Sequence, residues 1–248
     1  MQEFIPGIAV AFVAAFLLGS IPFGLVISKL FYKTDIRKHG SGNIGTTNAI
    51  RTMGKKGGFA VFLLDFGKGL LSGFLALWIG GLSLHLRGHE LGLGDLFGVL
   101  RPFGLGPIGD GSLFSVQLTE TLLAFAILGC VLGHIFSPWL KFRGGKGIAV
   151  AIGCLFVAIG VVGAVLELLI FTSLVLITRY VSVGSIASAA ACPFFGLLYY
   201  WGNWPAILCL TILGCAVVWA HRQNIKRLIA GNESRVGSKK KAESGEKK

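Results

Sequence analysis

The stretch Ile148–Ile177 reads IAVAIGCLFVAIGVVGAVLELLIFTSLVLI, and its length decides between two topologies for the whole chain. A helix needs about 20 mainly apolar residues to cross a bilayer. These 30 residues are too many for one relaxed crossing and few for two. Gly160, Gly163 and Glu167 lie near the middle, where a turn would fit. Two short helices joined by a turn are predicted, because only an even number of crossings here places the basic C-terminal tail on the same side as the other basic segments.

The composition of the whole chain points to an integral membrane protein. The 248 residues are 54% hydrophobic and only 14% charged, with a mean hydropathy of +0.76. Soluble domains usually carry about a quarter charged residues. The net charge of +12 is confined to short islands between apolar runs, so it does not form the extended basic face of a nucleic-acid-binding protein. We expect no nucleic acid partner.

Basic residues set the expected orientation. Other apolar stretches long enough to cross a membrane are Phe4–Ile27, Gly58–Leu84, Val116–Phe136, Val183–Trp201 and Pro205–Ala220. Lys and Arg collect in Lys29–Lys56, Lys141–Lys146 and Arg222–Lys248, whereas residues 83–117 contain only Arg87 and Arg101. The positive-inside rule places the three islands in the cytoplasm. The fold predicted is an all-α membrane protein with seven transmembrane helices, the N-terminus outside and the C-terminus cytoplasmic.

We expect one membrane domain over residues 1–231, with residues 83–117 as an external insert. Residues 232–248 are polar and rich in Ser and Lys, which predicts a basic, disordered cytoplasmic tail. The N-terminal apolar run has no basic residues before it, which favours a retained first helix over a cleaved signal peptide. The five cysteines lie in apolar stretches without a CxxC pair, so we expect neither a disulfide framework nor a zinc site.

The first basic island contains an unusual concentration of hydrogen-bond donors. Residues 35–54 read DIRKHGSGNIGTTNAIRTMG, with hydroxyls, amides and Arg51 set among glycines. Glycines let backbone N–H groups approach a ligand closely, and a concave set of such donors suits phosphate oxygens. A Walker A pattern is absent. Residues 40–45, GSGNIG, match GxGxxG in letters but follow an apolar helix and not a predicted strand, so nucleotide binding has little support.

Three further segments rich in hydrogen-bond donors are also predicted to lie on the cytoplasmic side of the membrane. Gly144-Gly145-Lys146-Gly147 opens a predicted helix at Ile148, and a helix N-terminus with a lysine is a ready anion site. His221 and Asn224 lie at the membrane end of a helix and share a face at a spacing of three. Residues 178–185 form the last segment. Together the four segments predict a site for a ligand with more than one phosphate-type group, next to acyl chains.

Ordered motifs along the chain are similar to those of a known family. They are Gly19-Ser20-Ile21-Pro22-Phe23-Gly24, the pattern Ser-Gly-Asn-x-Gly-x-Thr-Asn-x-x-Arg at Ser41–Arg51, Asp65-x-x-Lys68-Gly69, Gly133-His134 with Phe142–Gly147, and His221-x-x-Asn224 through Glu233. The chain resembles the bacterial acyl-phosphate:glycerol-3-phosphate acyltransferases of the PlsY type. It departs from them in the long segment 83–117, in Ser137-Pro138 and in Val150.

The resemblance implies a multi-pass enzyme of the bacterial cytoplasmic (inner) membrane, with its site on the cytoplasmic face. It would transfer a fatty acyl group from acyl phosphate to the sn-1 hydroxyl of glycerol 3-phosphate, giving lysophosphatidic acid and phosphate without a cofactor. Its expected partners are these two substrates, membrane lipid and other enzymes of phospholipid synthesis. The enzyme must hold two phosphates, aim the hydroxyl and stabilise a developing oxyanion.

Roles for individual residues follow from this reaction as expectations. The catalytic candidates are His221, Asn224 and Lys146. The substrate-binding candidates are Ser41, Asn43, Thr47, Asn48, Arg51, Gly144, Gly145, Lys146, Ser185 and Glu233. Arg51 and Lys146 would neutralise phosphates, and the glycine N–H groups would complete the phosphate cradle. The general base is either His221 or a substrate phosphate oxygen.

Two other classes of protein stay open at this point. Asp65, Lys68 and Glu167 lie within apolar spans and could line the path of a transporter for an anionic solute. A non-catalytic lipid-binding scaffold is the other alternative. Asp65 and Lys68 are three residues apart, which favours a structural ion pair over direct catalysis. His134 is equally compatible with packing and with contact to substrate. His85 and Glu90 have the spacing of the His-x4-Asp motif of other acyltransferases, but they lie in the expected external insert, and we interpret the match as a coincidence.

Overall fold

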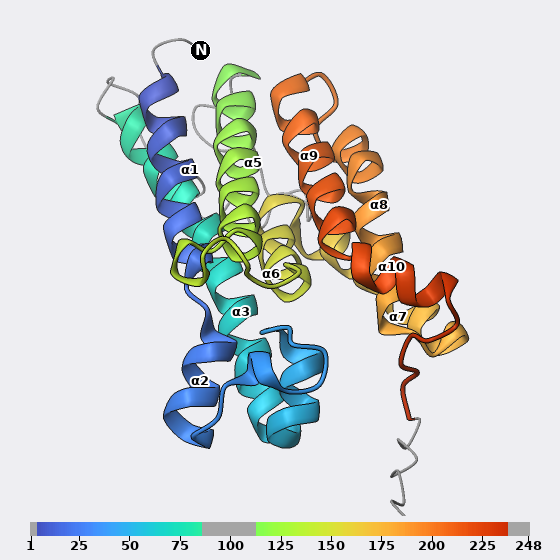
Figure 1. The fold of residues 1–248 in the computed structure, drawn as a ribbon. Coiled ribbons are helices and arrows are strands. Elements are labelled where there is room, and N and C mark those ends of the chain that lie inside the picture. The colour runs from blue at the N-terminus through green and yellow to red at the C-terminus, as the bar shows by residue number, and fades with distance from the viewer. Residues whose placement is uncertain (1–3, 86–112, 238–248) are drawn as a thin grey trace, which may run out of the picture.

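The computed structural model describes residues 4–85 and 113–237, and all regular elements in these ranges are helical. They are α1 (Ile5–Ser20), α2 (Phe23–Tyr32), the 3₁₀ helix η2 (Ile36–Lys38), α3 (Thr46–His85), α5 (Leu113–Ile135), the 3₁₀ helix η4 (Pro138–Leu140), α6 (Ile148–Ala158), α7 (Gly160–Thr178), α8 (Val181–Tyr199), α9 (Trp204–Ala220) and α10 (Arg222–Ile229). In Figure 1 the long helices form a bundle, and α2 with the start of α3 forms a lobe below it. Most of the expected insert, residues 86–112, lies outside the described residues.

The helices have the length and apolarity of membrane spans. Five spans among the described residues qualify by length and composition, or six when α9 and α10, bent by 53°, count as one. The predicted class, an all-α integral membrane protein, is therefore confirmed. The stretch 148–177 divides at Ile159 into α6 and α7, as predicted. Gly160 begins α7 with a φ of +71°, a conformation that suits glycine.

The first apolar stretch differs from the prediction of one helix. It breaks between α1 and α2 at Ile21 and Pro22, because proline has no N–H and disfavours a helical residue before it. Two carbonyl groups are thereby freed from the helix. Ser137 Oγ donates to the Ser20 carbonyl at 2.7 Å, and Lys68 Nζ donates to the Ile21 carbonyl at 2.8 Å. The break thus lets the end of α1 bind the loop after α5, through Ser137, and α3, through Lys68.

The second helix begins earlier than expected. α3 starts at Thr46 instead of near residue 58 and changes direction at Gly54, whose φ is +74°. Thr47 and Arg51 therefore lie on a helix and not in a loop. The lobe has a small core of its own, made by Ile27, Ile36, Ile44, Ala49, Met53, Val61 and Leu140. This core holds the first basic island against the underside of the bundle.

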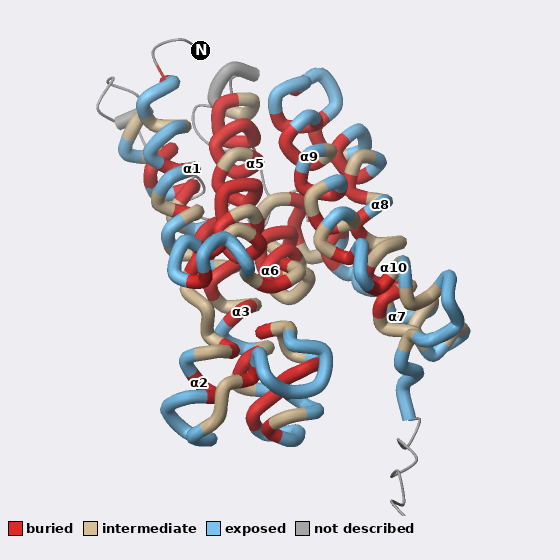
Figure 2. Tube along the Cα trace, in the orientation of Figure 1, coloured by how far each residue is buried: buried red, intermediate tan, exposed pale blue. Residues whose placement is uncertain are grey.

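α5 is the central helix and is buried along most of its described length (Figure 2). Glycines bring its neighbours close, as is common between membrane helices. A side chain at Gly133 would collide with the Phe16 carbonyl of α1, and one at Gly153 of α6 would collide with the Phe66 carbonyl of α3. The tight packing of α1, α3, α5 and α6 positions the loop after α5, which carries Lys146.

Candidate active site

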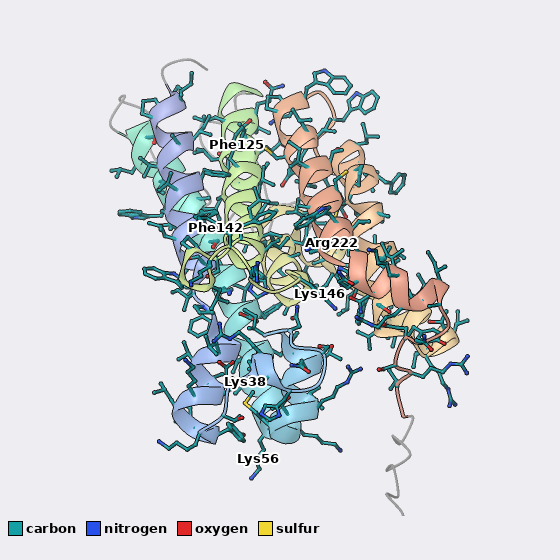
Figure 3. All side chains as sticks on the ribbon, viewed as in Figure 1. Lys38, Lys56, Phe125, Phe142, Lys146 and Arg222 are labelled. Atoms are coloured by element: carbon teal, nitrogen blue, oxygen red, sulfur yellow. The ribbon has the colours of Figure 1, made fainter. Side chains whose placement is uncertain are left out.

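A cavity of about 1350 Å³ lies where the lobe meets the starts of α6, α8 and α10. Figure 3 shows Lys146 at this junction, between the lobe and α10. The cavity is lined by these predicted residues: Ser41, Asn43, Thr47, Asn48, Arg51, Lys146, Ser185, His221, Asn224 and Glu233. Four segments that are far apart in the sequence therefore meet on one face of the bundle, as their charges predicted.

One wall of the cavity is apolar. Phe62 and Phe66 of α3, Phe156 of α6, and Leu168 and Phe171 of α7 line it. The Phe66 and Phe156 rings meet edge to face with their centroids 5.6 Å apart. Because the cavity combines this wall with cationic residues, it fits a ligand that has both a hydrocarbon chain and anionic groups.

The cationic part of the cavity is built around Lys146. The pKa of Lys146 is lowered to about 8, mainly by burial and then by the positive charges of Arg227 and Arg51, against the opposing effect of Glu233. Three cationic side chains thus face one carboxylate here, which is a surplus of positive charge. Such a surplus is relieved by an anion, so this end of the cavity is a candidate phosphate site.

The segment after α10 forms part of the wall. Glu233 accepts hydrogen bonds from Asn224 Nδ2 and from Arg227 Nε, both at 2.7 Å. Burial alone would raise the pKa of Glu233, but these hydrogen bonds lower it below its usual value, so the carboxyl is charged. Val236 N–H also donates to the Arg179 carbonyl at 2.8 Å. Residues 232–237 thus differ from the disordered tail that was expected, while 238–248 lie outside the described residues.

His221 lies beyond the end of α9 and is buried against the cavity. Its Nδ1 is 2.8 Å from the Val217 carbonyl, which can only accept a hydrogen bond. The proton is therefore on Nδ1, and Nε2 carries a lone pair. Burial lowers the pKa of His221 to about 4, so the ring is neutral at pH 7. It accepts a hydrogen bond, but it is a weaker base than an ordinary histidine.

Asn48 holds the loop of the first island together. Its amide donates to the carbonyls of Ile36, His39 and Asn43 at 3.1, 3.0 and 2.8 Å, and its oxygen accepts from Ser41 N–H at 2.8 Å. Both polar atoms are thus occupied inside the protein. In the same loop, the Asn43 side-chain oxygen accepts from Gly45 N–H at 2.8 Å.

Gly144 and Gly145 do not present free donors to the cavity. Their N–H groups donate to the carbonyls of Ile135 and His134 at 2.9 and 3.0 Å, and neither residue lines the cavity. A side chain at either position would collide with His134. The expected cradle of glycine N–H groups is therefore corrected at these two positions: the glycines let the loop pack against the end of α5.

Several lining residues were not predicted. Buried oxygen atoms of Thr46, Thr52 and Ser182 make no hydrogen bond of good geometry within the described residues, although the Glu233 carboxylate lies near Ser182. By contrast, the predicted Ser185 donates to the Val181 carbonyl at 2.9 Å. Ser182 and Ser185 are three apart on one helix, so a helical reading of the segment would have found both.

A buried ionic cluster lies at the inner end of the cavity. Lys68 Nζ is 2.9 Å from Asp65 Oδ1 and 2.9 Å from His134 Nδ1, and it also donates to the Ile21 carbonyl. The structural ion pair predicted for Asp65 and Lys68 is present. Asp65 and His134 line the cavity as well, so the cluster reaches the site.

Fold and cavity together define an all-helical integral membrane protein with a cation-rich, amphipathic site on one face of its bundle. Residues 9–231 match the model of the glycerol-3-phosphate acyltransferase family, and the chain belongs to this family.

Similar proteins cover nearly the whole chain. The glycerol-3-phosphate acyltransferase of Bacillus cereus (strain G9842) is 36% identical over 230 residues, which cover 93% of this chain and 96% of that protein. The Dechloromonas aromatica (strain RCB) protein of the same name is 35% identical over 236 residues, with 95% and 99% covered.

Two crystal structures are similar in fold. One is PlsY (YgiH), an integral membrane glycerol 3-phosphate acyltransferase, in its glycerol 3-phosphate form, with a TM-score of 0.70, 32% identity, and 93% of this chain and 96% of that chain covered. The lysophosphatidic acid form gives a TM-score of 0.68 at 32% identity, with 93% and 95% covered.

Proposed function

We propose that this protein transfers a fatty acyl group from acyl phosphate to the sn-1 hydroxyl of glycerol 3-phosphate, giving lysophosphatidic acid and phosphate. The observation that carries the proposal is the junction, in one cavity, of the cations around Lys146 with the apolar wall of Phe62, Phe66 and Phe171. A phosphate-bearing acyl donor needs both. One of the two similar crystal structures is the glycerol 3-phosphate form and the other is the lysophosphatidic acid form. This supports glycerol 3-phosphate as the acyl acceptor and lysophosphatidic acid as the product.

The choice of acyl phosphate rests on charge and chemistry. Arg51, Lys146 and Arg227 line the cavity, so each of two phosphates can meet at least one cationic side chain there. An acyl phosphate is a mixed anhydride and is already activated, so a covalent enzyme intermediate is not needed. The protein then contributes orientation and electrostatic stabilisation, which are large effects when donors are fixed in advance.

Residue roles follow from the contacts. Arg51 and Lys146 hold the phosphates, with Ser41 and Thr47 as further donors from the lobe. Asn224 has one unpaired oxygen among the described residues and is held by Glu233, so it orients the glycerol hydroxyls. We assign Asn43, Asn48, Gly144 and Gly145 to shaping the loops, because their described hydrogen bonds are made inside the protein. Ser182 replaces Ser185 as the hydroxyl that contacts substrate.

The reaction forms one ester bond and breaks one anhydride bond. The sn-1 oxygen attacks the acyl carbon, and the bond from that carbon to the phosphate oxygen breaks. His221 Nε2 accepts the hydrogen bond of the attacking hydroxyl and aims it. Because the pKa of His221 is about 4, a phosphate oxygen is the better final acceptor of the proton.

We further propose seven crossings with the N-terminus outside and the cavity in the cytoplasm of a bacterial cell. The eleven residues of α6 measure about 16 Å at roughly 1.5 Å per residue, about half of the hydrocarbon core. α6 and α7 therefore make a hairpin that returns the chain to the cavity face. Lys38→Cys and Lys226→Cys should resist a membrane-impermeant thiol reagent in intact cells and react after lysis. Reaction in intact cells would reverse the orientation.

The activity is tested with purified protein in detergent, glycerol 3-phosphate and three donors: acyl phosphate, acyl-CoA and acyl-acyl carrier protein. We expect lysophosphatidic acid and phosphate from acyl phosphate alone. Arg51→Ala and Lys146→Ala should each lower kcat/KM by about 10- to 100-fold, since hydrogen bonds to charged groups contribute about 1.5–3 kcal/mol. Normal turnover by both variants, or turnover only with acyl-CoA, would refute the proposal.

A further inference from the structure

The ionic cluster fixes where His134 carries its proton. Lys68 Nζ has three close neighbours: the Ile21 carbonyl and His134 Nδ1, at hydrogen-bond distances of 2.8 and 2.9 Å, and Asp65 Oδ1, at 2.9 Å in an ion pair without hydrogen-bond geometry. Both oxygens can only accept. Because Lys68 is an ammonium in its ion pair with Asp65, it has no lone pair and must also donate to His134. His134 Nδ1 is therefore the acceptor.

A neutral imidazole whose Nδ1 accepts a hydrogen bond carries its proton on Nε2. A doubly protonated ring would set an N–H of His134 against the N–H of Lys68, which the short distance excludes. His134 is only 3% exposed, and its Nε2 has no hydrogen-bond partner within residues 4–85 and 113–237. His134 lines the cavity, and its Nε2–H is not used by any other described residue.

Gly145 allows the ring to reach this position. A Cβ at Gly145 would collide with His134 Nε2 and also crowd both ring carbons beside it. The ring edge therefore lies directly against the loop whose next residue is Lys146. Lys146 and His134 both line the cavity, so a ligand bound there can meet both residues.

The two buried histidines of the cavity have opposite proton positions. His221 donates from Nδ1 to the Val217 carbonyl and keeps a lone pair on Nε2, whereas His134 accepts at Nδ1 and keeps a proton on Nε2. One ring can thus accept the hydrogen bond of an attacking hydroxyl while the other donates to the oxygen that gains charge. Acyl transfer needs one group of each kind.

We infer that His134 is a catalytic residue, a neutral donor whose Nε2–H bonds to the acyl carbonyl oxygen as it becomes an oxyanion. This assignment rests on the proposed function. A neutral N–H donor beside the Asp65–Lys68 ion pair, whose charges cancel, suits a carbonyl oxygen better than a phosphate dianion, which the cations around Lys146 bind. In an acyl phosphate the carbonyl adjoins the phosphate, as His134 adjoins the loop of Lys146.

Two amide substitutions separate this role from packing. In His134→Asn the amide oxygen can replace Nδ1 as acceptor for Lys68, but the side chain is too short to place a donor at the position of Nε2. His134→Gln reaches that position. We expect His134→Asn to lower kcat by about 100- to 1000-fold, the usual effect of losing one oxyanion donor. The KM for glycerol 3-phosphate and the melting temperature should change little, and His134→Gln should recover part of kcat.

The outcomes separate the inference from the proposed function. If wild-type protein has no acyl-phosphate turnover, the proposed function fails. If the wild type is active and His134→Asn stays within about threefold of it, the role of His134 alone is overturned. Nitrogen-15 NMR of histidine-labelled wild-type protein gives a readout that does not depend on folding of a variant. We expect a protonated Nε2 and an unprotonated Nδ1 for His134, with the reverse for His221, and the same proton position in both rings would overturn the inference.

Discussion

Asn224 Nδ2 lies 2.7 Å from Glu233 Oε1, and this bond fastens a segment beyond the last helix to the cavity wall. The second carboxylate oxygen of Glu233 accepts from Arg227 Nε, also at 2.7 Å. With its nitrogen occupied in this way, the Asn224 amide has a buried oxygen without a hydrogen-bond partner among the described residues. The orientation of a buried amide is thus set by a residue outside the helix that carries it.

Glu233 variants test this relationship. Glu233→Gln keeps an acceptor for Asn224, so we expect the KM for glycerol 3-phosphate to stay within about threefold of wild type. Glu233→Ala leaves the Asn224 donor unpaired and should raise that KM by about 10- to 100-fold, in line with roughly 1.5–3 kcal/mol for a hydrogen bond to a charged group. Steady-state kinetics at saturating acyl phosphate measure both values. An unchanged KM in Glu233→Ala would contradict the role of Glu233.

Lys146 predicts a dependence of substrate binding on pH. Its pKa of about 8 means that the side chain is charged below pH 8 and loses its charge as the pH rises. We therefore expect the KM for glycerol 3-phosphate to increase between pH 7 and 9.5. Lys146→Arg stays charged over this range and should remove the increase, even if its turnover is lower. The same pH profile in both proteins would assign the titration to another group.

Ser182 and Ser185 form a matched pair on α8. Ser182→Ala removes a buried hydroxyl of a cavity-lining residue, next to the Glu233 carboxylate, and we expect kcat/KM to fall by about tenfold, which corresponds to roughly 1.4 kcal/mol. Ser185→Ala removes a hydroxyl that is bonded to the Val181 carbonyl of its own helix and should change kcat/KM by less than about twofold. If Ser185→Ala has the larger effect, the original choice of Ser185 from the sequence is restored.

Gly153 tests the packing that positions the α5–α6 loop. A methyl group there would collide with the Phe66 carbonyl, whereas one at Gly67 of α3 meets no atom within contact distance. We expect Gly153→Ala to destabilise the protein by about 1–3 kcal/mol, because overpacking forces the helices apart. Gly67→Ala should be neutral or slightly stabilising, since alanine favours the helix. Melting temperatures in one detergent compare the two, and equal values would show that α3 and α6 separate easily.

The sequence was most informative where a signal is summed over many residues. Apolar length predicted most of the long helices, and the positions of the basic islands predicted which segments meet at the cavity. The prediction of helix boundaries was wrong where a single residue or a local contact determines where a helix begins or ends. Pro22 breaks the first stretch, and α3 begins at Thr46 because the lobe provides a core for Ala49 and Met53.

The site itself shows the same division. Which residue types surround the cavity could be predicted, but not which of their atoms are free. Gly144, Gly145 and Asn48 have their polar groups occupied inside the protein, and this depends on contacts with Ile135, His134 and the loop carbonyls. Sequence spacing carries no record of such contacts.

The segment 232–237 has a practical consequence for any shortened version of the chain. The family match stops at residue 231, so a truncation at that point would seem harmless. It would delete Glu233, release the Asn224 amide and remove negative charge beside Lys146. A purification tag fused directly after residue 231 would therefore yield an enzyme whose cavity lacks the part of its lining that Glu233 provides, whereas a fusion after Gly237 would keep that lining.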